Sequence, residues 1–436
     1  MPENKISDKA YHEATKHSYL SVQVEPNYVD ASTQPSAFKV YPKFYRRVKL
    51  NINNPVHSFI SLTSAITLEK VYKDSLDKLR VNPSAGALYP TEVYVQVRKV
   101  PGILDGIYHL EVENNCLTLI YELIDDGLES YIIPDKSING FIFLISCVYY
   151  RSSWKYQNRS TRYCFLDSGH HLGAFASGVA KPLAASAYLH EKDIQLIFDF
   201  DKLALNLALG FENKEFITAC VVSGELQEKK VRPLRIKVPF VCGTDYFEPN
   251  QFIEDTYQAT AVQKSSQQQL KQPQLSFDKD KFYQTVLNRR SVRRFRKKSI
   301  SQEDYLYIMQ QLKQPIPTEN YEEIDIYSVI HRVEGILCGL YKDTSLIKTG
   351  NFSEQTGYLC INQAIARDSA VTLFFVSDYL NYQTAMQIAG FLGQRLYLAS
   401  NYLGIECSGV GAFYDDETQE LLETNKDVLY AMVIGI

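Results

Sequence analysis

The sequence of 436 residues lacks the motifs that mark several common classes of protein. Its eight cysteines include no Cys-x-x-Cys pair, so neither a zinc ribbon nor a disulfide framework is indicated. Its eight histidines include no His-Glu-x-x-His motif, and no metal is predicted. This use of cysteine is typical of a cytoplasmic protein.

Strong charge and long apolar runs are also missing. The net charge is −4, and no basic stripe interleaved with aromatic residues appears, which argues against a nucleic-acid binder. Residues 1–5 are polar and lack the apolar core of a signal peptide. The apolar segment 141–148 is too short to span a bilayer. We therefore expect a cytoplasmic protein that binds neither nucleic acid nor a membrane.

The sequence contains a loop of small residues between two prolines, just before the strand-like segment 92–97. The loop reads Pro83-Ser84-Ala85-Gly86-Ala87-Leu88-Tyr89-Pro90. Proline makes such a turn rigid, and the small side chains let the backbone approach a flat ligand closely. This composition is typical of a flavin-contact loop, but an ordinary tight loop before a core strand would share it.

A second segment is rich in arginine and reads Asn288-Arg289-Arg290-Ser291-Val292-Arg293-Arg294-Phe295. The guanidinium group is planar, always charged, and matches the oxygens of a phosphate. The segment therefore indicates phosphate binding. A solvated run of charge is the alternative.

The chain also carries an internal repeat. Residues 100–108 match residues 333–341 at six of nine positions, two of them glycine, with an offset of 233. Each copy precedes an apolar strand, at 141–148 and 371–376, and then a helix rich in small residues, at 163–188 and 385–402. Small side chains would let these two helices approach closely, although two unrelated core helices remain the alternative.

A polar stretch without apolar periodicity, residues 263–274, lies between the two copies. It predicts a linker, and together with the repeat it favours two domains over three. We expect an N-terminal domain at 1–250, a linker at 251–276 and a C-terminal domain at 277–436.

A third segment, residues 149–163, follows the apolar strand and holds the single tryptophan among many cations and phenols. Active-site loops lie at strand ends. A lysine such as Lys155 can act as a base when its surroundings lower its pKa, and a neighbouring phenol, Tyr156, can relay or accept a proton. A solvated loop with exposed cations is the alternative.

Together these segments resemble the nitroreductase superfamily of FMN enzymes. The pattern Arg151-x-x-Trp-Lys-Tyr, followed by Leu166-Asp167-x-Gly-His, is most similar to the SagB-type dehydrogenases, which include the cyanobactin and other thiazole/oxazole-peptide oxidases. The likeness covers most of residues 10–225 and, more weakly, 278–436. It implies an α+β fold of two tandem nitroreductase-like domains that bind FMN.

The resemblance also implies which residues serve the site. Lys155 or Tyr156 would be the catalytic base, and the sequence does not distinguish the two. The phosphate and ribityl chain of FMN would contact Arg289, Arg290, Ser291 and Arg293. The ring would contact Pro83, Ser84, Ala85 and Gly86, and further backbone contacts would come from Gly409, Val410 and Gly411. Many relatives have a basic residue near the C-terminus at the phosphate, and its substitutes here would be Gln363 and Arg395.

Each half lacks what the other half has. Segment 58–65, where the arginine motif of the family is expected, contains no arginine, and the Gly-x-Gly-Ala-Phe-x-Asp-Asp turn occurs only at 409–416. The C-terminal half has no Pro-Ser-Ala-Gly and no Trp-Lys-Tyr. We therefore expect an internal pseudodimer with one complete FMN site and one eroded site. Whether two such chains pair further stays open.

The resemblance implies two-electron oxidation of a thiazoline or oxazoline, in a peptide or a carrier-bound peptide precursor of a natural product, to the aromatic azole. The sequence does not distinguish the two ring types. Two other functions stay open: a general NAD(P)H-dependent flavin nitroreductase, and a catalytically inert scaffold that binds peptides.

Overall fold

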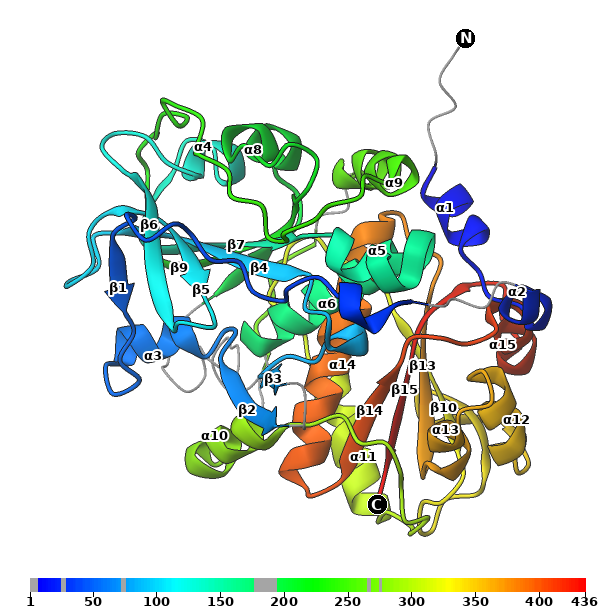
Figure 1. Cartoon of the computed structure of the whole chain (residues 1–436). Coiled ribbons are helices and arrows are strands. Elements are labelled where there is room, and N and C mark those ends of the chain that lie inside the picture. Colours follow the sequence, from blue (N-terminus) through cyan, green and yellow to red (C-terminus); the bar gives the residue numbers. More distant parts are fainter. Residues whose placement is uncertain (1–6, 25–28, 72–75, 176–193, 265–267, 274–276) are drawn as a thin grey trace.

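The structure, a computed structural model, describes residues 7–24, 29–71, 76–175, 194–264, 268–273 and 277–436. Helices and strands are mixed along the chain, in agreement with the predicted α+β class (Figure 1). Below, the N-terminal half means residues 7–250 and the C-terminal half residues 277–436.

The N-terminal half is built on a seven-stranded antiparallel sheet with the order β1-β6-β5-β4-β7-β9-β8. The central strands are almost entirely buried and rich in β-branched and aromatic residues, as such positions favour. The strands are β1 Arg47–Lys49, β4 Thr91–Arg98, β5 Gly106–Glu111, β6 Cys116–Glu122, β7 Ser137–Cys147, β8 Gln195–Ile197 and β9 Phe216–Gln227. A separate hairpin pairs β2 Ile66–Val71 with β3 Leu76–Arg80.

The C-terminal half is built on a six-stranded antiparallel sheet with the order β12-β11-β10-β13-β15-β14. Its strands are β10 Asp325–Ile330, β11 Gly339–Lys342, β12 Ser345–Thr349, β13 Val371–Ser377, β14 Glu406–Val410 and β15 Asp427–Gly435. Without its edge strand β1, the first sheet has six strands in the order β6-β5-β4-β7-β9-β8. When the strands of each sheet are ranked by their place in the chain, the two sheets have the same order. Strand β4 therefore corresponds to β10, and β8 corresponds to β14.

The repeat found in the sequence occupies equivalent places in the two sheets. The hydroxyl of Tyr108 donates to the Leu104 carbonyl at 2.8 Å, and that of Tyr341 donates to the Leu337 carbonyl at 2.9 Å. The two tyrosines are 233 residues apart, and so are the two leucines, which is the offset of the sequence repeat. The two nine-residue segments therefore fold alike.

Two long helices, α6 Ser160–Phe175 and α14 Tyr382–Tyr402, cross between the sheets (Figure 1). Almost every residue of both is buried, which is typical of a central helix. A side chain added at Gly169 would collide with the Gln387 carbonyl, and one at Gly390 with the Leu166 carbonyl. The close approach predicted from the small residues is confirmed, although residues 176–188 of the first predicted helix lie outside the described residues.

The remaining helices are shorter. They are α1 Asp8–Ala14, α2 Tyr19–Val24, α3 Pro55–Ser61, α4 Glu129–Ile132, α5 Tyr150–Tyr156, α8 Lys202–Ala208, α9 Gln251–Ala261, α10 Lys279–Asn288, α11 Gln302–Leu312, α12 Ser353–Leu359, α13 Ala364–Asp368 and α15 Asp415–Leu422, with short 3₁₀ turns at Ala31–Thr33, Ala85–Ala87 and Gln157–Arg159. Two of these helices, α10 and α11, pack against α14. Within the described ranges, no helix is long and apolar enough to cross a membrane.

Two expectations about connecting segments differ from the structure. Residues 149–163 are not an extended loop, because they form α5, a 3₁₀ turn and the start of α6. The first part of the predicted linker is helical as well, since α9 buries Ile253, Thr256 and Tyr257 at helical spacing on one face. The described residues that follow α9, up to the start of α10, contain no helix or strand.

Candidate active site

The predicted segments meet at a cavity between the two halves of the chain. Segment 83–86, Tyr156 of α5 and one face of α6 line it from the N-terminal half. Ser291, Arg293 and segment 408–412 line it from the C-terminal half. Neither half forms this cavity alone.

The loop of small residues before β4 has an unusual backbone. Gly86 has a φ of 64°, and Ala87 and Tyr89 have φ values of 56° and 46°. Glycine adopts this left-handed region freely, whereas other residues pay about 1–2 kcal/mol. The Ser84 hydroxyl accepts from the Tyr89 amide at 2.9 Å and closes the loop. Such strain persists where the surroundings hold the chain, often at a functional site.

Lys155 and Tyr156 reach this loop from helix α5. A Cβ atom placed on Gly86 would lie 2.8 Å from the Tyr156 hydroxyl and 3.3 Å from the Lys155 Nζ. The Tyr156 ring lies 4.3 Å from that of Tyr163, measured between centroids. Burial, together with Tyr163 and Asp167, raises the pKa of Tyr156 well above its ordinary value, so its hydroxyl is neutral near pH 7.

Ser291 and Arg293 line the cavity from the C-terminal half. The Ser291 hydroxyl lies 2.8 Å from the Tyr397 hydroxyl, which also accepts from the Gly409 amide at 2.8 Å. Arg293 is exposed, and among the described residues it has no ion pair. Its guanidinium group is among the side chains that line the cavity.

The structure does not place Arg289 and Arg290 on the cavity wall with Ser291 and Arg293. Arg289 is buried and donates to the Val81 carbonyl at 2.7 Å and to the Arg80 carbonyl at 3.2 Å. Arg290 donates to the Thr67 carbonyl at 2.8 Å. Both arginines therefore hold the β2–β3 region of the N-terminal half against the C-terminal half. The Nη1 of Arg289 has no partner among the described residues, and burial lowers the pKa of this group.

The two suggested substitutes for a C-terminal base differ in position. Gln363 lines the cavity and donates to the Ala412 carbonyl at 3.4 Å. Arg395 is buried elsewhere, where it donates to the Pro315 carbonyl at 2.9 Å and to the carbonyls of Gln311 and Gln314. It fixes the chain after α11 because buried donors need acceptors, and it does not reach the cavity.

The glycine-rich turn after β14 is held by residues of the other half. The Tyr163 hydroxyl donates to the Gly411 carbonyl at 3.2 Å, and Arg159 donates to the same oxygen at 3.4 Å. A side chain on Gly411 would collide with the ring of Tyr163. The absence of a Cβ atom therefore allows the turn to lie against this ring.

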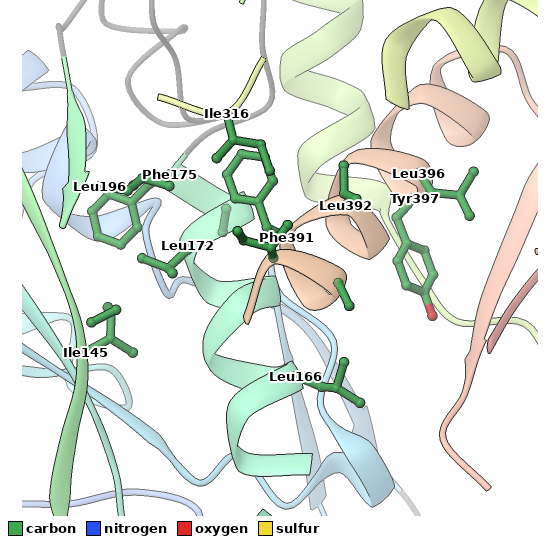
Figure 2. Close-up of a cluster of buried hydrophobic side chains, with 14 of the residues drawn as sticks. Ile145, Leu166, Leu172, Phe175, Leu196, Ile316, Phe391, Leu392, Leu396 and Tyr397 are labelled. Carbon is green, nitrogen blue, oxygen red and sulfur yellow. The ribbon is translucent and has the colours of Figure 1, made fainter. Parts of the chain in front are cut away.

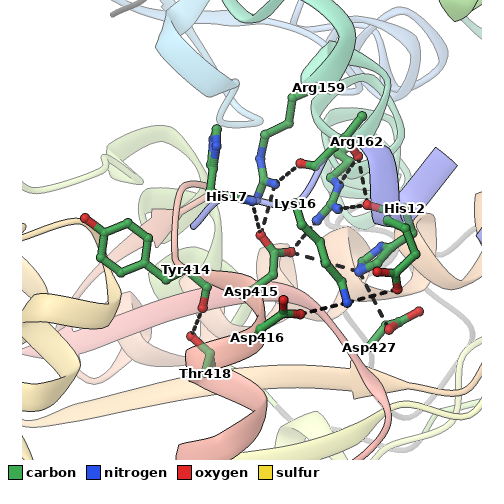
Figure 3. A network of polar contacts seen from close by, with 12 residues as sticks. His12, Lys16, His17, Arg159, Arg162, Tyr414, Asp415, Asp416, Thr418 and Asp427 are labelled. Atoms are coloured by element: carbon green, nitrogen blue, oxygen red, sulfur yellow. Dashed lines mark hydrogen bonds and ion pairs between the residues drawn. The ribbon is translucent and has the colours of Figure 1, made fainter. Parts of the chain in front are cut away.

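A buried polar network fixes the end of the same turn (Figure 3). Asp415 is 1% exposed and pairs with Arg162 at 2.7 Å and with Arg159 at 3.1 Å. It also accepts from the His17 amide at 2.8 Å. Burial would raise the pKa of Asp415, but the two guanidinium groups hold it below its usual value. Arg159 and Arg162, expected in a solvated or catalytic loop, are thus structural links between the two halves.

Four cavity residues on α6 were not among the predicted site residues, although the last three belong to the motif Leu166-Asp167-x-Gly-His: Tyr163, Leu166, Asp167 and His170. They are spaced at i, i+3, i+4 and i+7, which puts them on one face of a helix. This spacing was visible in the sequence once the segment was assigned to a helix. Tyr397 and Tyr430 carried no comparable pattern, because they reach the cavity only through the packing of α14 and β15.

Two comparisons with known proteins found similar sequences. Residues 286–436 match the model of the Nitroreductase family. A protein of Methanocaldococcus jannaschii named as a putative nitroreductase is 34% identical over 94 residues, which are 20% of this chain and 46% of that protein. The chain thus matches about half the length of this relative.

The nitroreductase-like fold extends over the whole chain. A crystal structure described as a putative nitroreductase from Anabaena variabilis superposes with a TM-score of 0.78 and covers 98% of this chain and 99% of its own. The two sequences are 23% identical, so the comparison concerns the fold. The N-terminal half, outside the range of the family model, is therefore part of the same architecture.

Proposed function

We propose that the chain is an FMN-dependent dehydrogenase that oxidises a thiazoline or oxazoline ring in a peptide, or a carrier-bound peptide, to the azole. Its two halves would form an internal pseudodimer of nitroreductase-like domains with one FMN site. Support for the pseudodimer comes from the shared strand order, the repeated Tyr108 and Tyr341 contacts, and a cavity lined by both halves.

The residues around the cavity fit FMN. The small residues of 83–86 and the backbone of 408–412 offer two faces between which a flat ring could lie. Arg293 and Ser291 offer a cation and a hydroxyl for the phosphate and ribityl groups. Behind this wall, the unpaired Nη1 of Arg289 adds positive charge that no acid neutralises among the described residues. These features suit an anionic ligand with a planar ring.

The position of Lys155 and Tyr156 beside Gly86 carries the proposal for azoline oxidation. FMN bound there would supply the two-electron acceptor for the hydride that leaves the azoline ring. Lys155 would accept the proton that leaves the adjacent ring atom, and Tyr156 would orient the substrate by donating a hydrogen bond. The raised pKa of Tyr156 makes its neutral phenol a weak proton acceptor, which favours Lys155 as the base.

Parallel assays of the purified protein test this function. Oxidation of an azoline peptide to the azole, with a flavin absorbance spectrum, is the expected result. A general flavin reductase would instead turn over a nitroaromatic with NAD(P)H and leave the azoline peptide unchanged, and an inert peptide-binding scaffold would be colourless.

In the proposed pseudodimer, the second potential FMN position would be closed. It would lie between β8, the counterpart of β14, and the segment before β10. There the Leu196 amide donates directly to the Pro317 carbonyl at 2.8 Å. Ile316, Phe391, Phe175 and Leu196 are at most 4% exposed and belong to one apolar cluster (Figure 2). Direct backbone pairing and apolar packing leave no place for a flavin ring between these elements.

We therefore expect one FMN per chain. Flavin released by denaturation, measured against protein concentration after reconstitution with excess FMN, should approach a ratio of one. A ratio near two in fully loaded protein would contradict the closed second position.

Arg293→Ala should weaken the binding of FMN by about 10- to 100-fold, because a charge-assisted hydrogen bond contributes about 1.5–3 kcal/mol. The affinity for riboflavin, which lacks the phosphate, should stay unchanged. Fluorescence titration of flavin-free protein measures both constants. Arg294→Ala is the matched control, since Arg294 is also exposed but does not line the cavity. Equal losses for FMN and riboflavin would refute the phosphate assignment.

A further inference from the structure

Asp167 is a buried acid inside the cavity that the proposed chemistry leaves without a role. Its side chain lies on the cavity face of α6 and is 3% exposed. Among the described residues it has no ion-pair partner. A buried carboxyl group without a cation is costly when ionised, so such a group calls for an explanation.

Two hydrogen-bond donors to Asp167 come from the loop at the cavity. Its Oδ2 accepts from the Ser84 hydroxyl at 2.5 Å, and its Oδ1 accepts from the Ala85 amide at 3.2 Å. The Ser84 hydroxyl in turn accepts from the Tyr89 amide. This chain of contacts connects Asp167 to both ends of the left-handed stretch that includes Gly86, Ala87 and Tyr89. The carboxyl group therefore holds the strained loop in place.

We propose that Asp167 is a positioning residue that fixes the loop 83–90 against the flavin ring, and that its negative charge lowers the reduction potential of that flavin. The proposal rests on the FMN function proposed above. Reduction adds negative charge to the ring, and an ionised carboxylate that is buried beside it, away from the screening of bulk water, opposes this change. A protonated Asp167 has no such effect.

The charge of Asp167 changes near neutral pH. Burial raises the pKa of its carboxyl to about 7, although the bonds from Ser84 and Ala85 act in the opposite direction. The other titratable or charged groups around the cavity are Lys155 and Tyr156 of α5, Tyr163 and His170 of α6, Arg289 and Arg293 of the arginine segment, Tyr397 of α14 and Tyr430 of β15. Burial lowers the pKa of His170 to about 3, and burial raises those of Tyr156, Tyr397 and Tyr430, so these four stay neutral between pH 5.5 and 8.

Asp167→Asn tests the electrostatic part, since asparagine has the same shape without the charge. At pH 8 the variant should favour reduced over oxidised FMN about tenfold more than the wild type, which is a rise in potential of about 30 mV for a two-electron couple. At pH 5.5, where Asp167 is protonated, the two potentials should agree. Spectroelectrochemical titration at both pH values measures them. A difference that is absent at pH 8, or equal at both pH values, would overturn the proposal.

Asp126→Asn is the matched control. Asp126 is also a buried aspartate bonded to a hydroxyl and to backbone amides, but it lies at the edge of the N-terminal half, beside Tyr121 and Arg235. Its replacement should lower the melting temperature without changing the flavin potential at either pH. A shift like that of Asp167→Asn would show that any buried aspartate has this effect.

The flavin-free protein gives a second test that does not depend on FMN. The folded protein holds a proton on Asp167 up to a higher pH than the unfolded chain does. Stability from this group is therefore present at low pH and is lost as the pH rises through about 7. The stability of Asp167→Asn relative to the wild type should thus rise between pH 5.5 and pH 8. If the difference in stability between Asp167→Asn and the wild type were the same at both pH values, the proposed ionisation of Asp167 would be wrong. If neither the wild type nor any variant bound flavin, the proposed function would be wrong instead.

Discussion

Replacing Lys155 by alanine should lower the rate of azoline oxidation by about 10²–10⁴-fold, the usual contribution of a positioned proton acceptor. The flavin content should stay near normal, because Lys155 and Tyr156 belong to α5 and not to the segments that would hold the phosphate and ribityl chain. Tyr156→Phe should have a smaller effect, since the phenylalanine ring can still pack against Tyr163. Single-turnover oxidation of an azoline peptide, followed by loss of flavin absorbance, measures the chemical step.

Three controls separate chemistry from binding. Photoreduction of the flavin needs neither peptide nor base and should be intact in both variants. Tyr150→Phe removes a hydroxyl from the same helix, but Tyr150 does not line the cavity, so its rate should match the wild type. Lys155→Ala with Tyr156→Phe should be little slower than Lys155→Ala if the pair acts as a unit. A double variant that oxidised the peptide at a near wild-type rate would require another base.

Asp415→Ala should lower the free energy of unfolding by about 3–5 kcal/mol, because it leaves the buried guanidinium groups of Arg159 and Arg162 without their counter-ion. It should also weaken FMN binding, since Arg159 and the end of the turn position the Gly411 carbonyl at the cavity. Urea denaturation of the flavin-free protein, followed by circular dichroism, measures the first effect.

The adjacent Asp416 provides the matched control. It pairs with Lys16 at 2.9 Å, but its side chain is 68% exposed. Asp416→Ala should therefore change stability by only about 0–1 kcal/mol. Because the folded pKa of Asp415 is depressed, its contribution should be present near neutral pH and be lost as the pH falls through that value. Equal effects of the two alanine variants would show that burial of the Asp415 network is not what stabilises the turn.

Much of the architecture was visible in short stretches of sequence. The repeat at 100–108 and 333–341 predicted two related units, and its tyrosines make the same contact in both. The small residues of the two long helices predicted the close crossing at Gly169 and Gly390. These features depend on local spacing and on side-chain size, and both can be read from the sequence.

The roles of individual cations could not be read in the same way. Arg289, Arg290 and Arg395 suggested phosphate binding, yet each donates to backbone carbonyls within the protein. Residues 149–163 suggested a solvated or catalytic loop, yet Arg159 and Arg162 are buried against Asp415. In the sequence, an arginine that binds a ligand looks the same as an arginine that donates to a buried carbonyl. The partner is decided by packing between distant segments.

The sequence by itself singled out three segments that line the cavity: the small-residue loop before β4, the arginine segment and the glycine-rich turn after β14. The tertiary structure alone decided which side chains of these segments face one common cavity. It also placed Asp167 beside the loop, and it joined β8 to the segment before β10 through the pairing of Leu196 with Pro317 and the packing of Ile316 and Phe391. The physical reason is that local propensity fixes backbone conformation, whereas burial, charge pairing and cavity shape arise only when α6 and α14 bring the two halves together.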